Sequence, residues 1–309
     1  MKPLSDESGQ TLGMTILAMA ALLGMSALVL DVGTWLHERR NLQATADAAA
    51  LAGAQVLPDD PAEAGRLALA YANANGGGVA PDGVSISSAS VPNDEITVEA
   101  RTRAPGFFSQ VFDVSSVEVG ARATARAQNL ASARYVAPIA VSEQHPMLQC
   151  QPVPCFDQPT QIPLAKLRQP AASTAAGSFG LVNLDQNATG TAGAAVLADW
   201  LRNGFGGVMS PGSYRSVPGA TFNSSQFRDA LTARVGDELL FPVYRSITGS
   251  GSTARFEVIG WVGFTLTSFT GSGWSGTLEG RFTRVTWDGV ALNGASGPDF
   301  GVRTISLVR

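Results

Sequence analysis

An uncharged apolar run near the start of the chain is the clearest pattern in the sequence. Residues 12–30 read LGMTILAMAALLGMSALVL. A helix of that length, at about 1.5 Å per residue, approaches the roughly 30 Å of a bilayer's hydrocarbon core. The alternative is a cleaved secretory signal, which needs a basic start and an apolar core of roughly 7–15 residues. Because Lys2 stands beside Asp6 and Glu7 and the run is longer, the pattern favours a retained transmembrane anchor.

Beyond the span, the sequence predicts that the same helix continues to about residue 56. The segment is rich in Ala, Leu, Gln and Arg and contains no proline before Pro58. Small side chains on neighbouring turns permit close approach by another helix or by the protein's own domain. The positions predicted to pack in this way are Ala20, Gly24, Ala46, Ala49 and Gly53. For the pair in the span, ordinary small residues of an apolar helix are the favoured interpretation.

Residues 58–130 predict a small α/β unit. Asp60 followed by Pro61 marks a helix start, and the glycines at 76–78 mark its end. Two-residue alternation then predicts three strands, at 84–91, 95–103 and 117–125. Between the last two strands the sequence predicts a short helix with three aromatic side chains packed inward: Phe107, Phe108 and Phe112.

Residues 131–309 predict a larger, β-rich domain. Segments 255–267 and 277–287 are dense in β-branched and aromatic residues and flank glycine turns, which favours antiparallel neighbours in a sheet. Further strands are predicted at 135–141, 162–167, 179–184, 239–244 and 304–308, and helices at 192–202 and 225–234. The predicted fold is therefore α+β, with an anchor and helical stalk at 1–57, the small unit at 58–130 and this domain at 131–309.

The composition argues against nucleic-acid binding and indicates the orientation of the chain in the membrane. The formal net charge is −4 and lysine occurs only at Lys2 and Lys166, so the basic stripe of a nucleic-acid-binding protein is missing. The positive-inside count nearly ties, because Lys2 and the amino terminus oppose Arg39 and Arg40. The low charge and the many Gly, Ser, Thr, Pro and Asn residues are usual in exported domains. They decide the predicted orientation, with the N-terminus inside and the bulk of the chain outside.

The two cysteines, Cys150 and Cys155, are closely spaced. An even pair in an exported protein is more often a small disulfide loop than a metal site. A zinc site would need two further ligands, and the only histidines are His37 and His145. We therefore predict a disulfide, and neither a metal nor a cofactor.

No motif in the sequence carries an enzymatic prediction. Gly271, Gly273 and Gly276 match the spacing G-x-G-x-x-G, but strands are predicted on both sides, whereas dinucleotide binding needs a helix after the motif. A Ser-His-Asp arrangement would have to use His145. The carboxylates whose spacing allows an acid-base pair are Asp237 with Glu238 and Glu257 with Glu279. Solvated charges at strand ends and turns are the favoured interpretation of these pairs.

Four short motifs precede, end or follow the span. They are Glu7-Ser8-Gly9-Gln10, Leu30-Asp31-Val32-Gly33, Arg39-Arg40-x-Leu42-Gln43 and Ala46-Asp47-Ala48-Ala49-Ala50-Leu51-Ala52. Together they resemble the N-terminal segment of the TadE/TadG-like proteins of Flp (Tad) pilus-assembly systems, over about residues 7–56. The positions that carry the resemblance are Gly9, Gln10, Asp31, Gly33, Arg40, Leu42, Gln43, Ala46, Asp47 and Ala50. The resemblance implies a component of a bacterial pilus apparatus, anchored in the cytoplasmic membrane with an extracytoplasmic body.

Two departures limit what the resemblance implies. Pseudopilins of such systems are cleaved after a Gly followed five residues later by Glu, whereas Met14 stands five residues after Gly9. Some TadG proteins also carry a von Willebrand A domain with an Asp-x-Ser-x-Ser metal motif. The segments that start at Asp6 and Asp113 both fail at its last position. The resemblance therefore implies a TadG-like protein without prepilin-peptidase processing and without that adhesive module.

Three functions follow from these observations. The leading hypothesis is a structural or assembly component of a Tad-like pilus or related envelope apparatus, with other membrane or pilus-assembly proteins and the lipid bilayer as partners. The second is a surface module that binds polysaccharide or protein through exposed aromatic residues, with Trp261, Trp274 and Trp287 as candidates. The third is an anchored hydrolase, which requires a deep pocket with convergent polar groups. Neither nucleic acid nor a small-molecule substrate is expected.

Overall fold

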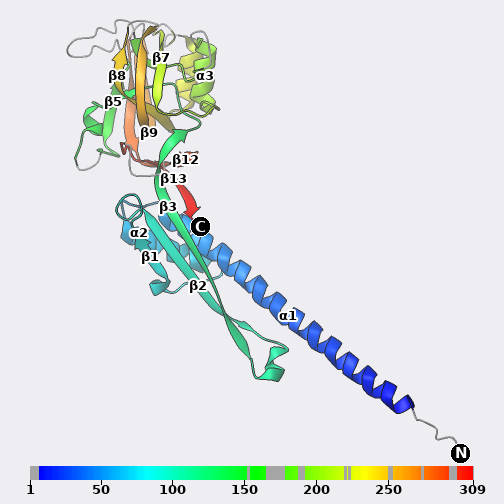
Figure 1. Ribbon diagram of the computed structural model, residues 1–309. Helices are drawn as coiled ribbons and strands as arrows, with labels where there is room; N and C mark the ends of the chain where they lie inside the picture. The colour runs from blue at the N-terminus through cyan, green and yellow to red at the C-terminus, as the bar shows by residue number, and fades with distance from the viewer. Residues whose placement is uncertain are drawn as a thin grey trace, which may run out of the picture. The chain divides into compact units, whose positions relative to one another are not determined.

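The computed structural model (Figure 1) divides the chain into two compact units. The first comprises Met1–Ala127 with Ser306–Arg309, and the second comprises Gln128–Ile305. The structure describes residues 7–151, 154–164, 178–186, 192–218, 221, 224–249, 253–272, 275–291 and 298–308. The mixed α+β class with a long N-terminal apolar helix is confirmed.

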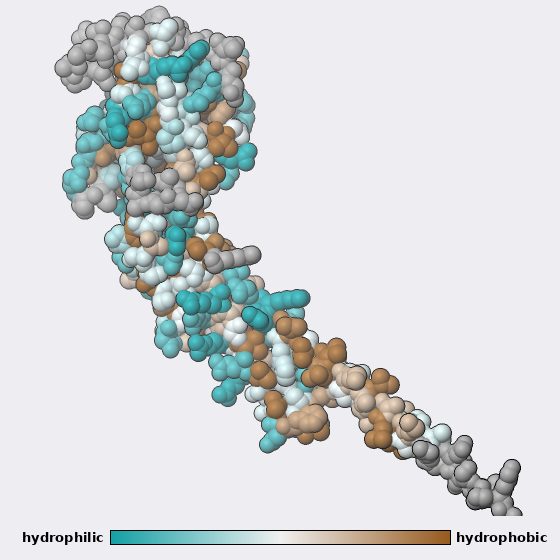
Figure 2. Space-filling model, in the orientation of Figure 1, coloured by the Kyte–Doolittle hydropathy of each residue, from teal (hydrophilic) through white to brown (hydrophobic). Residues whose placement is uncertain are grey.

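The first unit is built on one long helix, α1, which spans Glu7–Ala54. Its first part contains a window apolar enough to cross a membrane, and no residue of that window is buried within the protein. Figure 2 shows this part as an exposed, largely apolar rod. Side chains become buried only at Asp31 and again from Leu42 onward. The helix therefore has an exposed apolar half and a half that packs into its own unit.

Helix α2, at Pro61–Ala74, packs on the second half of α1. The side chain of Asp60 caps it by accepting a hydrogen bond from the backbone N–H of Glu63 at 2.9 Å, as the sequence predicts. One face of α2 consists of small buried residues, Ala64, Ala68 and Ala72. They meet the small residues of α1, since a Cβ added at Gly53 would lie 2.8 Å from the carbonyl oxygen of Ala64. The two helices approach so closely because side chains are nearly absent between them.

Three antiparallel strands complete this unit, and the longer two, β2 and β3, form a hairpin. Strand β1, at Val84–Ser87, pairs with β2, at Glu95–Pro105, which pairs along its whole length with β3, at Ser116–Ala133. β2 contacts α1. The side chains that alternate inward along β2 and are buried are Ile96, Val98 and Ala100. The hairpin follows α1 toward the apolar half of that helix (Figure 1).

The turn between β1 and β2 is organised by the buried carboxylate of Asp94. Its oxygens accept hydrogen bonds from the backbone N–H groups of Ala89 at 2.6 Å, Ser90 at 2.8 Å and Val91 at 3.1 Å. Burial alone would raise the pKa of Asp94, but these hydrogen bonds favour the charged form and hold the pKa below its ordinary value of 3.8. The charge of Asp94 is thus part of the folded turn.

Replacing Asp94 with asparagine should lower the free energy of unfolding at pH 7 by about 1.5 kcal/mol, since hydrogen bonds to a charged acceptor are lost. A pKa that is lower in the folded state stabilises above pH 3.8, and this contribution disappears as the pH falls through the folded value. Urea unfolding from pH 3 to pH 7 should show the wild type and the variant converging at the acid end. Parallel curves at every pH would contradict a role for the charge.

The end of the β2–β3 hairpin differs from the prediction. A short helix with Phe107, Phe108 and Phe112 packed inward was expected, and this is wrong. The segment forms only a 3-10 turn at Ser109–Phe112, and these aromatic side chains are 63%, 45% and 81% exposed. The hairpin extends beyond α2 and β1, so neither of these two elements covers the rings.

The domain boundaries also differ from the predicted ones. We expected a stalk ending at residue 57, a separate unit at 58–130 and a domain at 131–309. In the structure the stalk and the small α/β region form one unit, because α2 and β2 pack directly on α1. That unit also takes in the end of the last strand, from Ser306 onward.

Among the residues that the structure describes, the second unit is built around a mixed sheet of seven strands. Its central order is β4-β8-β9-β10-β5, with β7 beside β9 and β6 beside β7. The bounds are β4 Val141–Ser142, β5 Pro159–Pro163, β6 Ser178–Val182, β7 Gly212–Pro218, β8 Glu238–Thr248, β9 Arg255–Ser272 and β10 Ser275–Thr283. β8, β9 and β10 form a continuous antiparallel meander. Its β9–β10 pair confirms the antiparallel pairing predicted for residues 255–267 and 277–287. The remaining described strands, β11 Val285–Thr286, β12 Gly289–Ala291 and β13 Val302–Val308, belong to the sheet that contains β1, β2 and β3.

Two amphipathic helices, α3 at Ala194–Asn203 and α4 at Ser225–Ala233, belong to the same unit. They contact each other and bury Leu197, Leu201, Phe227 and Leu231 in a core shared with the sheet. Most of the fully buried rings of this core come from the meander, where Phe264 stacks on Phe241 with ring centres 5.3 Å apart.

Candidate functional site

The motif residues lie on α1, and most of the described ones hold the first unit to that helix. Leu42, Ala46 and Ala50 are buried against the rest of the unit. The side-chain amide of Gln43 donates hydrogen bonds to the Asp47 carboxylate at 2.8 Å and to the backbone carbonyl of Arg122 at 3.1 Å. Asp47, one of the motif positions, therefore orients the amide that links α1 to β3.

Asp31 makes the most elaborate contact of the motif. It stands directly after the apolar span and is 1% exposed. Its carboxylate accepts hydrogen bonds from three successive backbone N–H groups at the hairpin end, those of Phe107 at 2.9 Å, Phe108 at 3.1 Å and Ser109 at 2.6 Å. Successive N–H groups that converge in this way form an anion-binding concavity. The carboxylate thus fixes the hairpin end to the last turn of the span.

One turn farther along α1, a second hydrogen bond reaches the same hairpin. The indole N–H of Trp35 donates to the backbone carbonyl of Pro105 at 3.1 Å. Gly33 and Arg40, by contrast, are exposed. Gly9 and Gln10 lie in the first turns of α1, where the structure describes the backbone alone.

The residues predicted to pack against other helices fall into two groups. Ala46, Ala49 and Gly53 are buried within their own unit. Ala20 and Gly24 are exposed on the span, and a Cβ added at Gly24 would meet nothing within 4 Å. Only the second group is available to a neighbouring helix.

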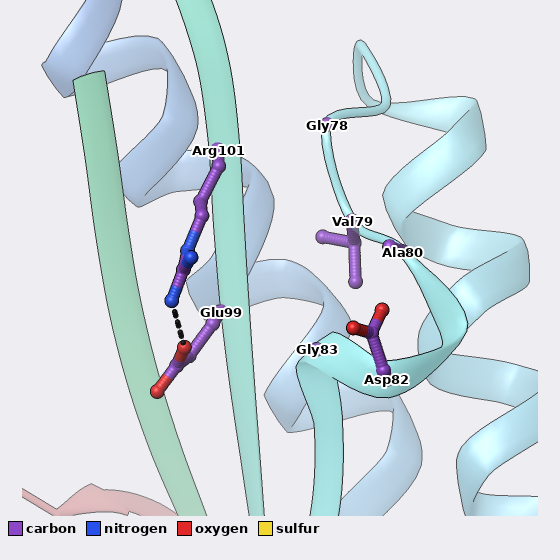
Figure 3. Close-up of a pocket in the computed structure, with 7 residues that line it drawn as sticks. All are labelled: Gly78, Val79, Ala80, Asp82, Gly83, Glu99 and Arg101. Carbon is purple, nitrogen blue, oxygen red and sulfur yellow. Dashed lines mark hydrogen bonds and ion pairs between the residues drawn. The ribbon is translucent and has the colours of Figure 1, made fainter. Parts of the chain in front are cut away.

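An open hollow of about 430 Å³ lies beside β2 in the first unit. Figure 3 shows Glu99 and Arg101 of β2 joined by an ion pair of 3.0 Å, with Asp82 across the hollow. The segment 78–83, which forms the other side of the hollow, lies close to β2. The backbone N–H of Arg101 donates a hydrogen bond to the carbonyl of Gly78 at 2.7 Å. A Cβ at Gly83 would clash with the carbonyl of Glu99. The hollow contains one solvent-exposed ion pair, Glu99 with Arg101, and one further carboxylate, Asp82. These groups do not form the pair of nucleophile and general base that catalysis would need.

The carboxylates considered for catalysis have other partners. Glu257 accepts a hydrogen bond from the Ser246 hydroxyl at 2.7 Å, and Glu279 accepts one from the Ser268 hydroxyl at 2.5 Å. Asp237 and Glu238 are exposed, and Asp237 pairs with Arg234 at 3.2 Å. In the described ranges, no group of three His, Cys, Asp or Glu residues is placed to hold a metal ion.

His145 lies beside the cysteine loop and has local structural contacts. Its Nδ1 accepts a hydrogen bond from the backbone N–H of Met147 at 3.2 Å, and its ring packs edge-on against Phe282. Cys150 and Cys155 form a disulfide. These contacts organise the loop between β4 and β5.

The tryptophans proposed for ligand binding do not form an exposed row in the described part of the chain. Trp261 is 4% exposed, although it lines a hollow of about 380 Å³ in the second unit, and its indole N–H has no hydrogen-bond partner among the described residues. The indole N–H of Trp287 donates to the carbonyl of Arg134 at 2.8 Å. Trp274 and Gly273 lie outside the described residues, whereas Gly271 and Gly276 belong to the paired strands β9 and β10.

Comparison with known proteins gives one match. Residues 9–56 match the model of a family described as putative Flp pilus-assembly TadE/G-like. The N-terminal segment is TadE/G-like. This confirms the resemblance that the sequence motifs indicated, and the matched residues coincide closely with α1. No curated protein and no solved structure matches the chain.

The contact between the TadE/G-like segment and the hairpin end was not predicted from the sequence. Asp31 and Ser109 are 78 positions apart, and local patterns do not reveal such a pair. The available signal was a carboxylate placed directly after an apolar span, where an unpaired charge would be costly to bury.

Proposed function

We propose that this protein is a membrane-anchored structural or assembly component of a Tad-like (Flp) pilus or a related envelope apparatus, and that it acts through contacts with other membrane or pilus-assembly proteins. The match of residues 9–56 to the TadE/G-like family carries the proposal. The exposed apolar half of α1 supports it, because such a surface is stable in lipid rather than in water. The two units then lie outside the cytoplasm and the N-terminus inside.

A non-enzymatic role belongs to the same proposal. The candidate carboxylates Glu257 and Glu279 and the ring of His145 already have structural partners. A binding module built on exposed tryptophans has less support, because Trp261 is buried and Trp287 is tied to the backbone.

The test is the recovery of partners with the tagged, full-length protein from detergent-solubilised membranes. Gly24→Ile should reduce the recovered pilus-assembly proteins by about fivefold or more, equivalent to about 1 kcal/mol, because the branched side chain blocks close helix approach. Leu23→Ile is the matched control on the neighbouring position and should leave recovery unchanged. His145→Ala and Glu257→Gln should leave piliation unchanged. If His145→Ala and Glu257→Gln abolished piliation while Gly24→Ile still recovered the partner proteins in full, the result would favour an anchored hydrolase.

A further inference from the structure

The end of the β2–β3 hairpin carries an unusual cluster of exposed apolar side chains. Phe107, Phe108, Val111, Phe112 and Val114 are all at least 40% exposed, and Val111 reaches 82%. Elsewhere in the described part of the chain outside α1, large exposed hydrophobic residues stand singly. Single exposed residues are ordinary, whereas a contiguous cluster marks a surface that is covered by something. Figure 2 shows apolar surface both along the exposed half of α1 and at this hairpin.

The cluster is held at the level where the apolar span ends. The carboxylate of Asp31, the first residue after the span, binds the backbone of Phe107, Phe108 and Ser109. Ala27, one turn earlier on the same helix face, is half-buried, while the other described side chains of residues 11–30 are exposed. The hairpin end therefore covers α1 at the last turn of the span and not above it.

We propose that this hairpin end, Gly106–Val114, enters the membrane leaflet on the side of the first unit and lies at the boundary between headgroups and acyl chains. The inference rests on the proposed anchoring by α1. The first unit is then held to the bilayer at two points, through the helix and through the hairpin.

The backbone of the segment suits an apolar surrounding. Groups that leave water need internal hydrogen-bond partners. Besides the three N–H groups on Asp31, those of Val111, Asp113 and Val114 donate to carbonyls of the same segment, and that of Gly106 donates to the carbonyl of Ser115 directly after it. The side chains of Ser109 and Gln110 also bond to carbonyls within it, those of Val114 and Gly106. Most backbone N–H groups of the turn thus have hydrogen-bond partners within the protein.

The charges nearby fit a lipid surface better than a second apolar protein surface. Asp113 is the only ionisable side chain from Gly106 to Val114. Because a charged carboxylate is costly to bury in hydrocarbon, Asp113 keeps the hairpin end at the membrane interface. On the water side of the cluster the exposed charges on α1, β2 and β3 include Arg39, Arg40 and Arg103, with Glu118 opposite Arg103 across the ladder, so arginine predominates among them. Arginines at this level attract anionic headgroups. Apolar tips combined with a basic collar are the pattern of interfacial membrane binding.

The experiment uses the full-length protein reconstituted into vesicles of phosphatidylcholine and phosphatidylglycerol. The native cysteines are joined to each other, so Phe112→Cys or Val111→Cys adds one thiol for an environment-sensitive fluorophore. Lipids with a nitroxide on the upper acyl chain should quench this probe about twofold more than a probe at Val290→Cys, an exposed position of the second unit. Asp31→Asn should reduce the quenching at position 112, because the hairpin loses its carboxylate clamp.

A probe at Leu23→Cys in the span separates failure of this inference from failure of the anchor. Quenching at Leu23→Cys but not at Phe112→Cys or Val111→Cys would show that the hairpin stays in water and would overturn the inference. Absence of quenching at all three positions would overturn the anchoring itself. A probe at Phe112→Cys that is shielded only as the protein concentration rises in detergent would assign the cluster to contact between copies of the chain, which also overturns the inference.

Discussion

Gly53→Leu should destabilise the first unit by about 3 kcal/mol, the upper part of the range for overpacked cores. A Cβ at this position would lie 2.6 Å from Cδ1 of Ile96 and 2.8 Å from the carbonyl oxygen of Ala64. The isoleucine tip can move, but the carbonyl belongs to the first turn of α2 and cannot retreat without shifting the helix. The gain in helix propensity, about 1 kcal/mol relative to glycine, offsets only part of this loss. Hydrogen exchange of the α2 amides in the detergent-solubilised protein measures the effect.

Gly33→Leu provides the matched control on the same helix. A Cβ at Gly33 meets nothing within 4 Å, so the same substitution should leave the exchange of α2 unchanged. Equal loss of protection in both variants would mean that leucine acts through α1 itself and not through contact with α2. The comparison also decides how Gly53 is interpreted, because a destabilised unit would weaken partner binding without any direct contact at this position.

Phe264→Ala should cost the second unit about 4 kcal/mol, the usual loss for a fully buried phenylalanine. The ring is 0% exposed and lies between Phe241 and Phe282, with centroid separations of 5.3 and 5.4 Å. Its removal leaves a cavity in the middle strand of the meander, where both neighbouring strands are hydrogen-bonded and cannot close the gap. Urea unfolding followed by the exchange of β9 amides measures the loss.

Phe269→Ala on the same strand should cost clearly less, because that ring is only partly buried at the edge of the core. Phe264→Leu keeps most of the volume and should cost about 1.5 kcal/mol or less. If the two alanine variants were equally stable, burial at position 264 would not explain the stability of the meander.

Elements whose signals are local were predictable from the sequence. The capping carboxylate of Asp60 and the proline after it marked the start of α2, and the dense apolar alternation of β9 and β10 marked their pairing. The apolar span was equally clear, since uninterrupted length is itself the signal. In each case the deciding residues are neighbours along the chain.

Features that depend on distant neighbours were not predictable. Three phenylalanines between two strands indicate an apolar surface, but nothing local shows whether a second layer covers it. The answer came from the length of the hairpin, which outruns α2, and from Asp31 far away on α1. The parallel pairing of β11 with β13 is likewise a matter of topology, because no pattern within either short strand specifies it.

The first unit is discontinuous in sequence, and this has a consequence for its biogenesis. Strand β13 neighbours β3 in the sheet order, and its last residues, from Ser306, belong to the first unit. About 180 residues separate them from the rest of that unit, so at about 5–20 residues per second they leave the ribosome roughly 10 to 35 seconds later. During synthesis the edge of β3 that β13 covers stays open until β13 has emerged, and an open edge is a template for pairing with foreign strands. A chain shortened to end before Val302 would lack β13 and keep that edge exposed, so we expect it to fail in the cell by aggregation.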